Sequence, residues 1–212
     1  PNLEAMVVWL KECQIETVAM ESTGVYWIPV FQILEAHGFE VILVNAQHVK
    51  SVPGRKSDVL DCQWLRQLHS YGLLAGSFRP DDQICVLRSY IRQRDTLISD
   101  ASRHIQRMQK ALTQMNLHLH QVLSDLTGVS GLAILKAIVA GERDPHKLAS
   151  LKHERVRKPE AEIADALSGD YRPEHVFVLA QELKLYETYQ EQIADCDTQI
   201  ETYLNQIQAQ VT

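Results

Sequence analysis

The sequence predicts an α/β domain followed by a long helical region. Two short runs of aliphatic and β-branched residues, at 16–21 and 39–44, have the length and character of buried strands, and helical patterns flank them. Apolar residues then recur at alternating steps of three and four positions from Ile84 to Leu126, and again from Val176 to Ile207. This spacing is the heptad pattern of a coiled coil. The two kinds of pattern therefore divide the chain into an α/β part and an α part.

The α/β part reads as a strand, a helix and a second strand. Ser22 or Thr23 could cap the helix, whose inward face would include Val25 and Phe31, and Gly38 would end it. Two strands joined by a helix lie parallel in a sheet. We therefore expect a parallel pair of strands.

A basic loop and another helix follow the second strand. Residues 45–56 contain three cations, Lys50, Arg55 and Lys56, and no acidic residue. Ser57 suits the N-cap of a helix that begins at Asp58.

The two heptad arrays predict the arm and its pairing. Arg94 is the one polar residue in the first register, and Gln190 and Asp197 interrupt the second. Such helices fold back on each other as an antiparallel pair or pair with another copy, so we expect a homo-oligomer, at least a dimer. The predicted domains are residues 1–75 and 76–212.

Composition excludes several classes of protein. The chain has 212 residues, a formal net charge of −6 and no apolar run of the roughly 20 residues that span a bilayer. Its four cysteines are far apart and form no CxxC pair, which argues against a zinc site or a disulfide framework. We expect a cytoplasmic protein without a membrane partner.

Three carboxylates are candidates for a metal site. Glu21 ends the first predicted strand, at the sheet edge where open α/β sheets bind ligands. Asp58 and Asp61 are three residues apart on one face of the next helix and could converge on a divalent cation. The alternative is that Asp58 complements the helix dipole and Glu21 is an ordinary strand-end carboxylate. The order of strand, basic loop and paired aspartates favours the metal site.

The stretch from Met20 to Leu68 also resembles a known family. ESTGVY at Glu21–Tyr26, VNAQHVK at Val44–Lys50 and KSDVLD at Lys56–Asp61 are similar to motifs of DEDD-type insertion-sequence transposases. The resemblance implies a truncated RNase H-like (RuvC-like) nuclease domain followed by a long helical coiled-coil domain. It also implies that the whole protein is a bacterial enzyme that cuts and rejoins DNA.

The same resemblance implies residue roles and partners. Glu21, Asp58 and Asp61 match the second, third and fourth of four catalytic carboxylates, which bind Mg²⁺ or Mn²⁺. The first would be an Asp on a strand before Pro1, and a serine domain would follow Thr212, so we expect this chain to be inactive alone. The implied partners are DNA and a structured guide RNA.

Further cations are candidates for nucleic-acid binding, although a solvated helix face is the alternative. On the first long helix they are Arg88, Arg92, Arg103, Arg107 and Lys110. A compact basic run, Lys152, Arg155, Arg157 and Lys158, is either a nucleic-acid contact or a mobile loop, and Ser130 in GVSG reads as a helix cap.

Two other functions stay open from the sequence. One is a RuvC-like nuclease of another kind, such as a junction resolvase, although such an enzyme would lack this arm. The other is a non-catalytic coiled-coil interaction module with structural carboxylates.

Overall fold

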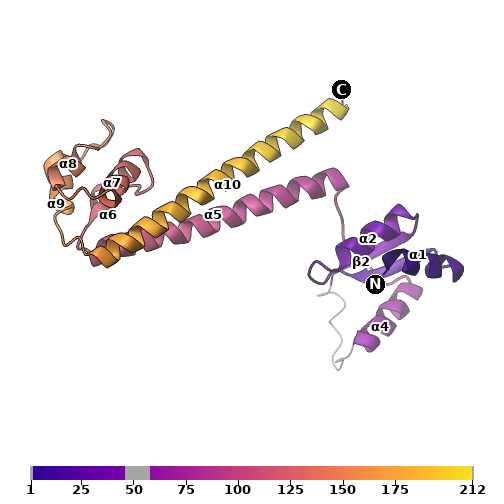
Figure 1. Cartoon of the computed structure of the whole chain (residues 1–212). Helices are drawn as coiled ribbons and strands as arrows, with labels where there is room; N and C mark the ends of the chain where they lie inside the picture. The colour runs from indigo at the N-terminus through magenta and orange to yellow at the C-terminus, as the bar shows by residue number, and fades with distance from the viewer. Residues whose placement is uncertain (1, 46–57, 212) are drawn as a thin grey trace. The chain divides into compact units, whose positions relative to one another are not determined.

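The computed structural model describes residues 2–45 and 58–211, except for the side chains of residues 58–60, 210 and 211. The chain forms two compact units, residues 1–80 and 81–212. Figure 1 shows the elements of each unit.

The first unit is built around two parallel strands. They pair over their whole length, from Thr17 opposite Glu40 to Glu21 opposite Val44, as the sequence predicted. The elements in chain order are α1 (Leu3–Glu12), β1 (Thr17–Glu21), α2 (Trp27–Ala36) and β2 (Glu40–Val44).

A small core joins α1 and α2. Val7, Leu34 and Phe39 are its buried members, and half-buried aliphatic residues surround them. Gly38 ends α2 with a φ of +84°, as predicted, but Val25 is 68% exposed and lies before the helix. The inward face predicted for Val25 is therefore wrong.

The predicted cap of α2 is also wrong. Tyr26 is the N-cap residue and makes no side-chain capping bond. Ser22 instead donates its hydroxyl to the Val44 carbonyl, at 3.1 Å, and Thr23 donates to Glu21. Both hydroxyls thus serve the end of β1, and the helix starts later than expected.

Helix α4 (Asp58–Ser70) completes the first unit. Its last turn packs on the start of β1, where His69 Nε2 lies 2.8 Å from Thr17 Oγ1. Gly72 follows the helix with a φ of +68°. The predicted cap Ser57 and the cations Lys50, Arg55 and Lys56 lie outside the described residues.

The second unit is an antiparallel pair of long helices with a helical cap. Helices α5 (Asp82–Gln114) and α10 (Pro173–Val211) lie side by side (Figure 1). Arg94, the polar residue in the first heptad register, forms an ion pair at 2.5 Å with Asp197, one of the two polar residues in the second register. Asp197 raises the pKa of the Arg94 guanidinium through this hydrogen bond. The two interruptions therefore satisfy each other.

Helix α5 is shorter than the heptad array predicted. It ends at Gln114, because Asn116 adopts a φ of +57° and the Met115 carbonyl accepts the N–H of Asp170. The apolar spacing continues to Leu126 because the apolar residues after Gln114 pack in the core of the cap. They do not form one face of a long helix. The prediction of one uninterrupted helix over 84–126 is wrong.

The helical cap comprises residues 115–172. Its fully buried residues include Leu119, Ile134 and Leu148, which join the core of the long helices. Its helices are α6 (Leu119–Val122), α7 (Val129–Val139), α8 (Pro145–Ala149) and α9 (Glu160–Ala166). Within the described residues, no helix has both the length and the apolar character that crossing a membrane requires.

Candidate functional site

Glu21 lies where both strands end. It is the last residue of β1, opposite the last residue of β2, Val44. Ser22 fixes the chain beyond it by donating its backbone N–H to the Val44 carbonyl at 2.9 Å. Thr23 Oγ1 donates to Glu21 Oε1 at 2.6 Å, so the carboxylate is oriented at the carboxyl edge of the sheet. Sequence reasoning placed Glu21 at this edge but missed the role of Thr23.

The two aspartates lie at the start of α4. Asp58 is its first residue, as predicted, and the side chain of Asp61 is half-buried one turn later. The side chain of Asp58 lies outside the described residues. The described His, Cys, Asp and Glu side chains contain no cluster of three that could hold a metal ion.

The side chains of Glu21 and Asp61 carry the oxygen donors that hard cations take. Among the described side chains, neither Glu21 nor Asp61 forms an ion pair with Lys, Arg or His. Carboxylate oxygens are among the ligands that Mg²⁺ and Mn²⁺ prefer. The two described carboxylates therefore fit a divalent metal by their chemistry.

The cations predicted on α5 share one face of that helix. All five are exposed, and at 3.6 residues per turn their positions fall within an arc of about 100°. They are Arg88, Arg92, Arg103, Arg107 and Lys110. Two of them are paired, Arg103 with Asp100 at 3.1 Å and Arg107 with Glu182 at 3.6 Å. The other three have no acidic partner among the described side chains.

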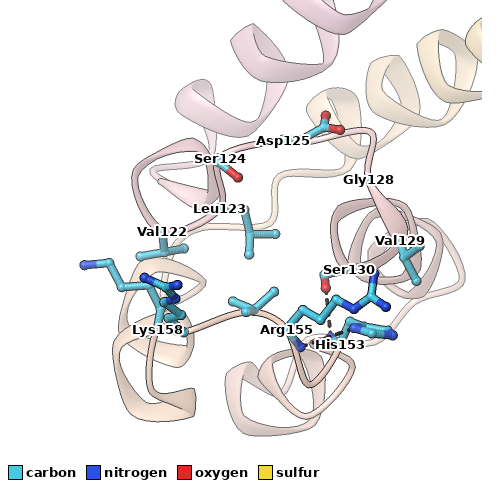
Figure 2. A pocket seen from close by; sticks show the side chains of 12 residues that line it. Val122, Leu123, Ser124, Asp125, Gly128, Val129, Ser130, His153, Arg155 and Lys158 are labelled. Carbon is cyan, nitrogen blue, oxygen red and sulfur yellow. Dashed lines mark hydrogen bonds between the residues drawn. The ribbon is translucent and has the colours of Figure 1, made fainter.

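The basic run in the cap lines a hollow. Arg155, Arg157 and Lys158 lie beside the segment from Val122 to Ser130, around a cavity of about 570 Å³ (Figure 2). Ser130 does not cap α7, whose N-cap is Gly128. Sequence reasoning treated the basic run and the GVSG motif as separate features. No periodicity in the sequence signals that they meet.

The comparison with known protein families defines the class of protein as a transposase. Residues 1–117 match the family model of IS110-type DEDD elements, whose description is transposase. The match covers more than half of the chain, and the chain belongs to this family of IS110-type DEDD transposases. Transposases act on DNA, and DEDD transposases generally use divalent metals. No curated protein matches the chain.

Proposed function

We propose that this chain is part of an insertion-sequence transposase that cuts and rejoins DNA with a divalent-metal acidic site. In this proposal residues 1–75 are a partial RuvC-like (RNase H-like) nuclease domain, and residues 76–212 are a helical coiled-coil domain. The observation that carries it is the family match over residues 1–117, which includes Glu21, Asp58 and Asp61.

The packing of α4 supports a meeting of the carboxylates. The helix rises about 12 Å between Asp61 and His69, and β1 extends about 13 Å between Thr17 and Glu21. His69 contacts Thr17. If α4 runs antiparallel to β1 from this contact, Asp61 lies level with Glu21, and Asp58 lies one turn further along.

The proposed roles follow from these positions. Glu21, Asp58 and Asp61 hold Mg²⁺ or Mn²⁺, and Thr23 orients the Glu21 carboxylate by its hydrogen bond. Bound metal of this kind supplies an activated nucleophile and charge stabilisation at a phosphodiester. Within the described residues β1 pairs with β2 alone.

The proposed partners are DNA and a structured guide RNA. Cations neutralise phosphates and release counterions, which gives binding that depends on salt. The proposed contacts are Lys50, Arg55 and Lys56 in the first unit and Arg88, Arg92, Arg103, Arg107 and Lys110 on α5. The proposed location of the protein is the bacterial cytoplasm, where DNA and RNA are both present.

We also propose that the long helices associate with a second copy. Ile84, Ile91 and Ile98 recur every seven residues on α5 and remain 41%, 40% and 39% exposed beside α10. A stripe with this repeat fits a partner helix. Sedimentation velocity at micromolar concentrations should show a dimer or larger species, and a monomer throughout would contradict this part.

Titration with Mn²⁺ by calorimetry tests the acidic site. The parent chain should bind Mn²⁺, and Asp61→Asn should weaken the affinity by about tenfold or more, because it removes a charged ligand oxygen. Glu12→Gln removes the same charge from an exposed position at the end of α1 and is the matched control. Equal affinities for the parent and Asp61→Asn would contradict the proposal.

A further inference from the structure

The cavity in the helical cap has a basic side and an apolar wall. Figure 2 shows Arg155 and His153 on one side of the hollow and Lys158 on the other. Val122, Leu123, Val129 and Val156 supply apolar surface. Val129 is 74% exposed. The hollow therefore offers both charge and apolar contact.

The cavity is held together by specific contacts. Ser130 is 6% exposed, and its Oγ accepts the backbone N–H of His153 at 2.8 Å, which ties the basic segment to α7. Lys152 donates to the carbonyls of Lys158, at 2.9 Å, and Val156, at 3.5 Å. The basic segment is thus a closed loop, and Lys152 serves its structure.

The close packing of α7 against the segment before it depends on a glycine. A Cβ at Gly131 would lie 2.0 Å from the Leu126 carbonyl oxygen, so only glycine allows the first turn of α7 to pack against the segment before it. The apolar wall and the basic loop are therefore positioned by Gly131 and Ser130 together.

Two arginines at the cavity are not neutralised. Arg155 and Arg157 are exposed, and no described carboxylate pairs with either. Lys158 is paired with Glu162. Asp125 also lines the hollow, but its Oδ1 accepts from the N–H and hydroxyl of Thr127, at 2.8 and 2.9 Å. In Figure 2 its carboxylate points away from the basic loop.

This local excess of positive charge stands against an acidic background. Residues 128–212 contain 9 basic and 14 acidic groups. Two unpaired guanidinium groups beside a hollow are suited to contact an anionic ligand. Guanidinium groups bind phosphate through paired hydrogen bonds and also stack on bases.

We propose that this cavity binds an unpaired nucleotide segment. Arg155 and Arg157 contact its phosphates, and the apolar wall of Val122, Leu123 and Val129 covers a base or sugar. A duplex can be bound by a flat basic surface that contacts its phosphates. A concave apolar wall makes further contact only with a base or sugar that is not enclosed in a double helix. The proposed role of this site is to hold nucleic acid, and no chemical step is assigned to it. It does not depend on the acidic site in the first unit.

Binding of labelled strands to the full chain tests this inference. The probes are a single-stranded RNA, a single-stranded DNA of the same sequence and the corresponding DNA duplex, measured by fluorescence anisotropy over a range of salt. The parent should bind at least one single strand more tightly than the duplex, and the preferred strand tells whether the source is RNA or DNA. The double variant Arg155→Gln, Arg157→Gln should bind it about tenfold more weakly, with a salt slope lower by about 0.7 per arginine.

Two further variants distinguish binding at the cavity from attraction to any positive charge of the cap. Lys147→Gln with Arg172→Gln removes two cations of the same cap that lie outside the cavity, and its affinity should match that of the parent. Ser130→Ala changes no charge but frees the His153 N–H, so it should weaken binding about threefold and leave the salt slope unchanged.

The outcomes decide the inference. It is overturned if the parent binds no strand, if the duplex binds as tightly as the single strands, or if the Arg155 and Arg157 variant binds like the parent. Equal losses in the double variant and the Lys147 and Arg172 control would also overturn it. Mn²⁺ binding enters none of these measurements, so failure here is distinct from failure of the proposed acidic site.

Discussion

The two units of the chain differ in how their sequences make a core. In the helical unit, residues such as Leu112, Ile134 and Leu167 are fully buried, and one continuous core links the long helices to the cap. Among the described side chains of the first unit, every side chain of β1 is half-buried, and the buried ones are six: Val7, Phe31, Leu34, Phe39, Leu43 and Val44. Parallel strands are usually covered on both faces. The candidate acidic site therefore lies on the less well packed unit.

The largest expected effect comes from the core of the helical unit. Leu112→Ala should lower its free energy of unfolding by about 2–5 kcal/mol, because it leaves a cavity where Leu112 is fully buried. Trp9, Trp27 and Trp64 all lie in the first unit, so tryptophan fluorescence reports on that unit, while ellipticity at 222 nm is dominated by α5 and α10. The variant should move the ellipticity transition and leave the fluorescence transition in place.

Leu34→Ala is the matched experiment in the first unit. Leu34 is 1% exposed, so this variant should move the fluorescence transition alone. In the parent, fluorescence should be lost at a lower denaturant concentration than ellipticity. Coincident transitions that shift together in both variants would show that the two units do not unfold separately.

A smaller effect is expected from the polar pair inside the long helices. His104 Nδ1 lies 2.6 Å from Glu182 Oε2, and both side chains are nearly buried, at 10% and 13% exposed. His104→Leu should cost about 1–3 kcal/mol, because the Glu182 carboxylate loses its buried partner. Gln106→Leu, at an exposed position on the same helix, is the control. If His104→Leu changes only the ellipticity transition, the two units unfold separately. Equal stabilities of His104→Leu and Gln106→Leu would show that the pair of His104 and Glu182 does not stabilise the fold.

The smallest expected effect concerns acid sensitivity of the cap. The N–H groups of Asp144 and Arg143 donate to Glu142 and lower the pKa of its carboxyl. A lowered pKa means that the charged form stabilises the fold above the unfolded-state pKa and that this stability is lost as pH falls through the folded pKa. Glu142→Gln should lower the melting temperature by about 1 °C at pH 7, and the difference should vanish at low pH. A difference that grows on acidification would contradict this sign.

Local patterns in the sequence predicted most of the first unit. The strands Thr17–Glu21 and Glu40–Val44 each begin one residue after the predicted start. They follow from short-range chemistry, as do the stop at Gly38 and the start of α4 at Asp58. The hydrogen bond from Thr23 to Glu21 could not be predicted in this way. A hydroxyl that follows a strand can either cap the next helix or bind a carboxylate, and the sequence is the same in both cases.

Tertiary context decided what the sequence missed in the helical unit. The apolar spacing continues past Gln114, and it would be the same whether these residues formed one face of a long helix or the core of a compact cap. The end of α5 at Gln114 therefore could not be predicted from this spacing. The bond between Ser130 and His153 joins segments that are far apart in the chain. Arg94 and Asp197 were visible only as irregularities, and their pairing required the antiparallel arrangement.

Paramagnetic broadening by Mn²⁺ in the ¹⁵N spectrum of the chain tests most directly whether the carboxylates form one metal site. Signals of Glu21, Ser22 and Thr23 should broaden together with those around Asp61, and Asp61→Asn should remove the effect at both segments. Broadening that spares Glu21 while affecting Asp61, or that gathers on the acidic residues of α10, would contradict the account.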